Sequence, residues 1–212
     1  MIYSHLLFPV IFLSKFPKLK VERTFIIICC YGFLFFLVLA LDNWGYIPRT
    51  KLYYGLYTVV EYLFFLSIIF SNIKSRKFKI IAFFLSIGFF IFQAIYYFNK
   101  RKTLDTIPIG IETILIIIFS FYFFYEQLKE SVTPIYNQFF FWIAIGIIIY
   151  LCGSFFMYLL ANDIPRKQLE EYWFINYIFD TVKNLFFVMA GLVFLKQSRS
   201  SRKTILPNLD FY

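Results

Sequence analysis

Apolar blocks of membrane-spanning length alternate along the chain with short basic clusters. A helix needs about 20 apolar residues to cross the hydrocarbon core of a bilayer, with about 17–25 tolerated. Six blocks meet this length: Phe25–Leu41, Leu52–Ile73, Ile80–Phe98, Ile107–Tyr125, Phe139–Ala161 and Tyr172–Leu195. A seventh block, Ile2–Phe16, is shorter and contains Pro9. It is either a short first span, with Lys15 extending to the interface, or an interfacial helix, and we predict a span.

The pattern predicts an all-α integral membrane protein. Residues 1–197 are expected to form a seven-transmembrane-helix bundle, and residues 198–212 a short basic cytoplasmic tail. The composition agrees, because 61% of the residues are hydrophobic and only 16% are charged, far from the average of a soluble domain. The tail is too short to form a catalytic output domain, so any signal would have to pass to another chain.

Basic residues are distributed unevenly between the two sides of the predicted bundle. With seven spans, 13 Lys and Arg residues fall on the side of the tail and 7 on the opposite side. The richer side is expected to be cytoplasmic, which places the N-terminus outside and the C-terminus inside the inner (plasma) membrane of a bacterial cell. Contact between basic loops and the lipid bilayer accounts for the net charge of +9, so we expect no nucleic acid partner.

A weak internal repeat relates the second and third spans to the sixth and seventh. Each copy contains an Ile-Pro-Arg loop, at residues 47–49 and at 164–166, and ends on an apolar residue followed by Lys74 or Lys196. A duplication predicts a 3+1+3 parallel repeat, in which the fourth span is an unpaired connector. Glu61 and Lys183 would then occupy equivalent positions with opposite charges.

Charged side chains occur inside the predicted spans, where an isolated charge costs several kcal/mol. A rise of ~1.5 Å per residue places Glu61 about 15 Å, Asp180 about 13 Å and Lys183 about 18 Å below the outer surface. These three side chains therefore fall in one layer near the middle of the membrane. Glu112 lies nearer the outer surface and could line an outer mouth above them.

Helical spacing groups further polar residues with these charges. Asn176 shares a helix face with Asp180 and Lys183, and Thr58 shares a face with Glu61. The predicted ligand or switch residues are Glu61, Lys183, Asp180, Glu112, Asn176, Thr58 and Gln93. Two interpretations stay open: a water-accessible pocket or proton-sensitive switch, and a structural ion pair between Glu61 and Lys183 that fixes helix packing.

The sequence contains no recognisable metal-binding or catalytic motif. The single histidine, His5, has no potential metal ligand near it in the sequence, and the acidic residues follow no nucleophile–base pattern. We therefore expect no metal, no cofactor and no enzymatic activity.

Four functions are compatible with these features. A receptor or sensor module that signals through a separate cytoplasmic partner is preferred, with a small-molecule ligand at the polar layer. A small transporter is the main alternative, because a parallel repeat and a mid-membrane charged site suit alternating access. The remaining hypotheses are a retinal-binding protein that uses Lys183 and an acidic counterion, and a membrane lipid hydrolase that uses Glu61, Glu112 and Asp180.

Three short stretches carry a resemblance to a known group of proteins. They are residues 56–63 (LYTVVEYL), residues 141–154 from Phe-Trp to Gly-Ser, and residues 182–187 (VKNLFF). In these stretches the chain resembles small bacterial seven-helix membrane proteins related to the sensor modules of histidine kinases. The resemblance implies a fold more than an activity, and it suggests a histidine kinase as the type of cytoplasmic signalling partner.

Overall fold

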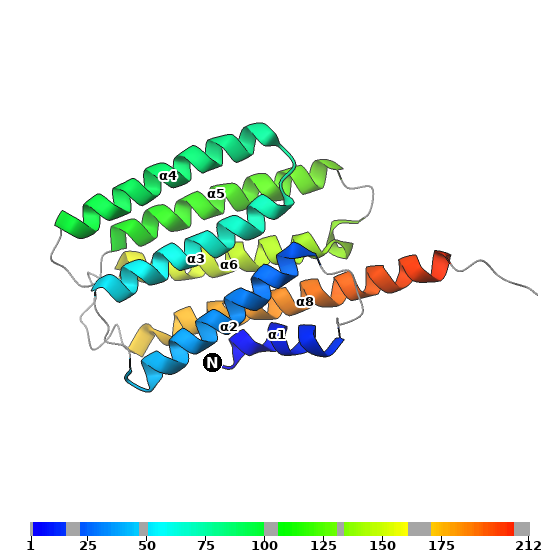
Figure 1. Ribbon diagram of the computed structural model, residues 1–212, viewed down its shortest axis with the longest axis horizontal. Coiled ribbons are helices and arrows are strands. Elements are labelled where there is room, and N and C mark those ends of the chain that lie inside the picture. The colour runs from blue at the N-terminus through cyan, green and yellow to red at the C-terminus, as the bar shows by residue number, and fades with distance from the viewer. Residues whose placement is uncertain are drawn as a thin grey trace, which may run out of the picture.

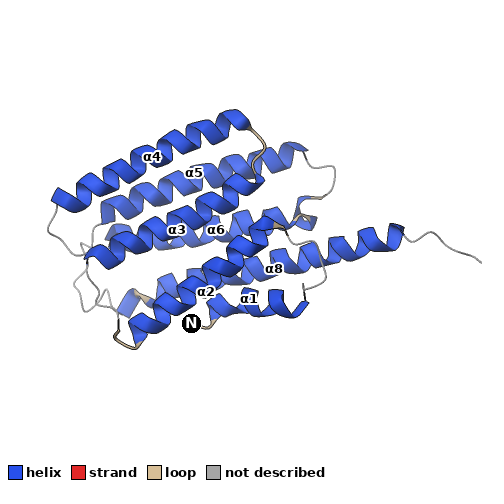
Figure 2. Ribbon diagram, viewed as in Figure 1, coloured by secondary structure: helices blue, strands red, loops and turns tan. Residues whose placement is uncertain are grey.

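The structure is a computed structural model that describes residues 2–15, 22–46, 51–99, 106–130, 134–160 and 171–205. These residues form an all-helical bundle, and no strand occurs among them (Figures 1 and 2). The α-helices are α1 (Ser4–Lys15), α2 (Arg23–Asn43), α3 (Lys51–Asn72), α4 (Arg76–Asn99), α5 (Thr106–Glu130), α6 (Phe139–Leu160) and α8 (Phe174–Ile205). A single 3-10 turn, η1 (Ile135–Asn137), precedes α6 within this described part.

Six of these helices, α2 to α6 and α8, are long and apolar enough to cross a membrane. They correspond to the six long blocks of the sequence, so the prediction of a multi-pass helical membrane protein is confirmed at this level. The seventh span is not confirmed. Helix α1 contains 12 residues, which at ~1.5 Å per residue gives about 18 Å, short of the bilayer core.

The helices form two groups that meet along α6. Helices α3, α4 and α5 contact one another, and α6 joins them through α5 (Figure 1). On the other side, α8 packs along α6, and the short helix α1 lies against both α2 and α8. Helix α2 closes the bundle through its contact with α3. Side chains from α1, α2, α3, α6 and α8 can therefore meet inside the bundle.

Glycines allow the closest helix approaches. A methyl group added at Gly146 of α6 would lie 2.8 Å from Cβ of Phe186 on α8, and one added at Gly153 would overlap the ring of Phe179. On the opposite side, a methyl group added at Gly32 of α2 would lie 2.5 Å from the backbone oxygen of His5. Small residues let helix backbones come together where lipid offers no hydrophobic driving force. Gly32 thus brings the start of α1 close to the centre of the bundle.

Aromatic side chains fill the interior at one end of the bundle. The ring of Phe25 on α2 is fully buried and lies 5.8 Å from Phe8 of α1, 5.1 Å from Phe139 of α6 and 4.9 Å from Phe194 of α8, measured between ring centroids. Large apolar side chains also cover the outer surface, where Phe84 on α4 is 66% exposed. Apolar groups on both the inside and the outside are what a helix bundle in lipid requires.

The structure does not confirm the predicted duplication, and it changes the predicted start of the tail. The 3+1+3 repeat is not confirmed, and both Ile-Pro-Arg loops lie outside the described residues. Helix α8 runs past the predicted end of the last span at Leu195 and continues to Ile205. The first part of the predicted tail is thus a continuation of the last helix, while residues 206–212 lie outside the described residues.

Candidate functional site

Lys183 is at the centre of a buried polar network. Its side chain has no exposed surface, although it lies within the apolar part of α8. The ammonium group donates hydrogen bonds of 2.6 Å to Oδ1 of Asp180 and 2.6 Å to the hydroxyl oxygen of Tyr31 on α2. It also lies over the ring of Tyr150 on α6, 3.9 Å from the centroid. An anion, a hydroxyl and a π-face thus surround the charge, as a buried ammonium requires.

Tyr31 connects Lys183 to Glu61 on α3. Its hydroxyl accepts the hydrogen bond from Lys183 and donates one of 3.2 Å to Oε1 of Glu61. Tyr150 donates a second hydrogen bond, of 2.8 Å, to the same carboxylate oxygen. The predicted association of Glu61 with Lys183 therefore takes the form of a hydroxyl bridge, and the direct ion pair of Lys183 is with Asp180, at 2.6 Å.

The second oxygen of Asp180 faces α1. Its Oδ2 atom lies 2.9 Å from Nε2 of His5 and 3.5 Å from Nδ2 of Asn184, one turn further along α8. Asn184 in turn donates a 3.1 Å hydrogen bond to Oγ of Ser4. We call the eight residues connected in this way the lysine network: Ser4, His5, Tyr31, Glu61, Tyr150, Asp180, Lys183 and Asn184.

The lysine network is sensitive to a change of one charge. With His5 neutral, the formal charges of Glu61, Asp180 and Lys183 leave one net negative charge inside the bundle. A proton on His5, or a bound cationic group, would neutralise it. Because charges in a low-dielectric interior interact strongly, such a change would alter the balance of contacts among the five helices that supply the network.

The other predicted site residues are buried but lie beyond the lysine network. Gln93 on α4 donates a 3.2 Å hydrogen bond to the backbone oxygen of Gly55, while its own Oε1 atom has no hydrogen-bond partner. Glu112 on α5 is 3% exposed, and its Oε1 atom is also without a partner. Thr58 on α3 is 3% exposed. Buried polar atoms without partners are rare and mark places where water or a ligand can be bound.

Asn176 lies at the N-terminal end of the polar face of α8. It is 7% exposed, and neither its amide oxygen nor its amide nitrogen has a hydrogen-bond partner. Asp180, one turn further on, is 15% exposed, whereas Lys183 is completely buried. The polar face of α8 therefore becomes progressively more enclosed from Asp180 to Lys183.

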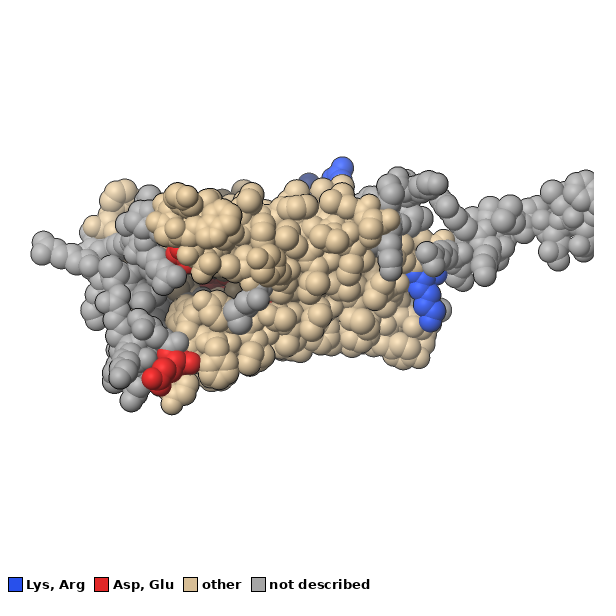
Figure 3. All heavy atoms as spheres, turned by 90° about the horizontal axis from the view of Figure 1, so that it is seen from below, with Lys and Arg blue, Asp and Glu red and all other residues tan. Residues whose placement is uncertain are grey.

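A hollow lies on the face of the bundle that carries α1. Figure 3 views the bundle from below, the side of α1 in Figure 1, and shows a depression toward the left end of the molecule, with acidic residues in red beside it. Helix α1 covers only part of the length of α2 and α8, so these two longer helices continue past its N-terminal end (Figure 1). Because α1 is short, it leaves space next to Ser4 and His5, the two residues through which α1 joins the lysine network.

Comparisons with known proteins assign this arrangement to no family. No family model matches the chain, and no curated protein and no solved structure matches it. The function must therefore be inferred from the chemistry of the site.

Five residues of the lysine network were not among the site residues predicted from the sequence: Ser4, His5, Tyr31, Tyr150 and Asn184. His5 has no neighbouring motif, yet the fold brings it from the start of the chain to Asp180. Tyr31 and Tyr150 are two of 17 tyrosines, and nothing nearby in the sequence distinguishes them from lipid-facing or core aromatics. A tyrosine hydroxyl buried at membrane depth does need a partner, but the sequence does not tell which tyrosines are buried.

Removing the bridging hydroxyl tests the geometry of the lysine network. We expect Tyr31→Phe to lower the free energy of unfolding by about 1–2 kcal/mol, because Lys183 loses an acceptor and Glu61 loses a donor in a buried setting. The free energy is measured by titrating purified protein from mild detergent into denaturing detergent. Tyr3→Phe, at a side chain that is 76% exposed, is the matched control and should change nothing. Equal effects of the two substitutions would contradict the bridge.

Proposed function

We propose that the chain is a receptor- or sensor-like membrane module that passes a signal to a separate cytoplasmic partner. The observation that carries this proposal is the continuity of α8. One helix supplies Asp180, Lys183 and Asn184 to the lysine network and then continues to Ile205, beyond the bundle (Figure 1). A displacement of α8 at the network would therefore be transmitted along a rigid element to its far end.

The lysine network supplies the event that would move α8. A ligand or a proton could bind the carboxylate of Asp180 in place of one of its present partners. This would change the charge balance where α8 contacts the helices α1, α2 and α6. Polar networks of this kind have discrete arrangements, because each buried polar group is either hydrogen-bonded or left without a partner, and a missing partner costs free energy. Ligand access through the hollow beside α1 fits this scheme, since the side chain of Asp180 is 15% exposed whereas Lys183 is completely buried.

The output is proposed at the end of the bundle where α8 emerges. The sequence there is basic, with Lys196 exposed near the end of the membrane-length part of α8 and Lys77 exposed at the start of α4. Basic juxtamembrane segments are typical of cytoplasmic surfaces. We accordingly propose a cytoplasmic C-terminus in a bacterial inner membrane and a signalling partner, such as a histidine kinase, at this surface.

A small transporter is the second candidate. Its support is the pair of partnerless oxygens on Glu112 and Gln93, which are buried on helices α5 and α4 and are not among the eight residues of the lysine network. A transported cation would need such acceptors along its path. The retinal hypothesis is disfavoured, because the Lys183 ammonium is already engaged by Asp180, Tyr31 and Tyr150. We propose no catalytic role for Glu61, Glu112 or Asp180.

The proposal is tested by asking whether the network controls the position of α8. Spin labels are attached at Lys196→Cys on α8 and Lys77→Cys on α4, with Cys29, Cys30 and Cys152 replaced by Ala. Pulsed electron paramagnetic resonance in liposomes then measures the distance distribution between the labels. We expect Tyr31→Phe to shift this distribution, while Tyr3→Phe leaves it unchanged. In the native host, a strain that carries Tyr31→Phe in the chromosomal copy of the gene should show changes in the same transcripts as a strain in which the gene is deleted.

Two other outcomes would separate the alternatives. An unchanged label distance together with unchanged transcripts, in a variant that reaches the membrane at normal levels, would refute the sensor proposal. Proton or cation flux into proteoliposomes that Tyr31→Phe leaves intact and Glu112→Gln abolishes would support the transporter instead.

A further inference from the structure

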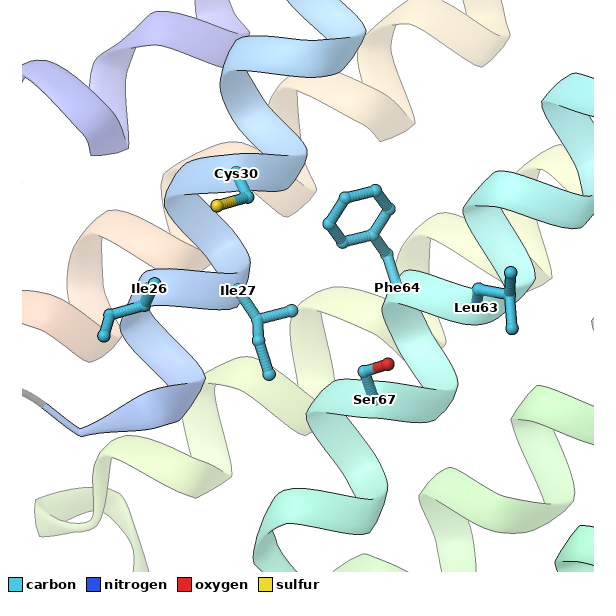
Figure 4. A pocket seen from close by; sticks show the side chains of 6 residues that line it. All are labelled: Ile26, Ile27, Cys30, Leu63, Phe64 and Ser67. Atoms are coloured by element: carbon cyan, nitrogen blue, oxygen red, sulfur yellow. The ribbon is translucent and has the colours of Figure 1, made fainter.

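A groove runs between α2 and α3 on the outside of the bundle (Figure 4). Its walls are apolar except for one thiol and one hydroxyl, and its lining residues are Ile26, Ile27, Cys30, Leu63, Phe64 and Ser67. The cavity volume is about 360 Å³. That is room for roughly a dozen methylene groups, each similar in size to a water molecule at ~30 Å³.

The groove opens outwards, away from the lysine network. Ile26 is 49% exposed and Leu63 is 44% exposed, and the other helices lie behind the groove in Figure 4. In the same view the ring of Phe64 lies between the two helices and the side chain of Ile27 extends toward α3. Since α2 and α3 are both of membrane-spanning length, the groove faces lipid and not a second layer of protein within the described residues.

A basic side chain continues the groove at the start of α2. Arg23 precedes Ile26, Ile27 and Cys30 by three, four and seven residues, so all four share one face of the helix. Arg23 is exposed, and at ~1.5 Å per residue its backbone is about 10 Å from that of Cys30 along the axis. A cationic side chain therefore lies at the end of the apolar groove, at the level where the apolar part of α2 begins.

The neighbouring end of α3 is polar and positively charged as well. Asn72, its last residue, and Thr24 of α2 exchange hydrogen bonds, 2.9 Å from the amide nitrogen of Asn72 to the hydroxyl of Thr24 and 3.0 Å in return. Lys74 follows in the turn after α3 and is exposed, and the backbone of this turn is held by Glu126 of α5 through 2.9 and 2.8 Å hydrogen bonds. This fixed turn places Lys74 beside the same end of the groove, together with the Glu126 carboxylate that holds the backbone of the turn.

From this arrangement we propose that the groove binds an anionic glycerophospholipid, with one acyl chain along Ile27 and Phe64 and the phosphate at Arg23 and Lys74. The chain would run parallel to the helices, as lipid tails do, and its methylenes would contact the apolar walls. The phosphate would then sit at the polar end marked by Thr24 and Asn72, where juxtamembrane cations attract anionic headgroups. This site is independent of the lysine network and of any signalling role.

The proposal is tested by native mass spectrometry of the full chain, delipidated in a neutral detergent. The protein is titrated with phosphatidylglycerol and, separately, with phosphatidylcholine carrying identical chains. We expect phosphatidylglycerol to bind about fivefold or more tightly than phosphatidylcholine, the effect of roughly one cation acting on one phosphate near the surface. Arg23→Gln should lower phosphatidylglycerol affinity about fivefold and leave phosphatidylcholine unchanged.

Matched variants separate the groove from general attraction by the basic surface. Lys129→Gln removes one exposed charge from the same end of the bundle, on α5, and should have no effect on either lipid. Ser67→Phe fills the groove and should weaken both lipids, while Ala94→Phe, on the exposed face of α4, should not. If Ser67→Phe does not fold, Ser67→Leu takes its place. Equal wild-type affinity for the two lipids, an equal loss in Lys129→Gln and Arg23→Gln, or undiminished binding in the filled groove would each overturn the proposal.

Discussion

Replacing Lys183 by Met is expected to lower the free energy of unfolding by about 3–5 kcal/mol. The substitution keeps most of the side-chain volume but removes the ammonium group from the lysine network, leaving Asp180 and Glu61 buried near each other with fewer partners. Stranding a buried charge in this way costs far more than the intact pair contributes. Lys196→Met, at an exposed position on the same helix, should cost less than about 0.5 kcal/mol.

A double-mutant cycle distinguishes a stranded charge from lost packing. Adding Asp180→Asn to Lys183→Met removes the uncompensated carboxylate, so the double variant should be more stable than Lys183→Met alone. The same cycle with Glu61→Gln should give a smaller coupling, because Glu61 reaches Lys183 only through Tyr31. Zero coupling in the first cycle would mean that the ion pair does not form in the membrane.

Gly146→Val is expected to cost about 3 kcal/mol and to disturb the lysine network as well. The new side chain would meet Cβ of Phe186 at 2.8 Å and the backbone oxygen of Lys183 at 3.4 Å. Neither atom is the far end of a flexible side chain, so α6 and α8 must move apart, and overpacking of this kind is destabilising. Unfolding in denaturing detergent, followed by tryptophan fluorescence, measures the loss.

Gly88 on α4 supplies the control for this substitution. A methyl group added there would meet nothing within 4 Å. Gly88→Ala should therefore be neutral or should stabilise the protein by about 0.5–1 kcal/mol, because alanine reduces the flexibility of the unfolded chain. If Gly146→Val is tolerated as well as Gly88→Ala, the close contact of α6 and α8 is not maintained in the membrane.

The long helices could be predicted from the sequence because hydropathy is a local property. Each of the six long blocks overlaps a described helix almost completely, for example Ile80–Phe98 with Arg76–Asn99. Residues on one helix face could also be predicted, since their spacing alone brings Asp180 and Lys183 together on α8. Depth counting predicted Glu61 in the layer of Lys183, but it could not show that the hydroxyl of Tyr31 connects the two side chains.

The remainder depends on contacts between segments that are distant in the sequence. The role of α1 was ambiguous because a helix of 12 residues, most of them apolar, suits either an interfacial helix or part of a span. Its insertion between α2 and α8 depends on Gly32, whose role is visible only when the two backbones are in place. Likewise, Tyr150 is separated from Glu61 by 89 positions, so no local pattern connects them.

The position of α1 also sets an order of assembly. Ser4 and His5 on α1 are made before their partners Asn184 and Asp180, which lie on α8. Until α8 has entered the bilayer, α1 has only α2 to pack against and its polar side chains have no counterpart there. The lysine network can therefore form only after α8 has been made. A chain in which α8 fails to insert leaves His5 and Glu61 in the bilayer without Asp180 and Lys183, a defect that membrane quality control could recognise.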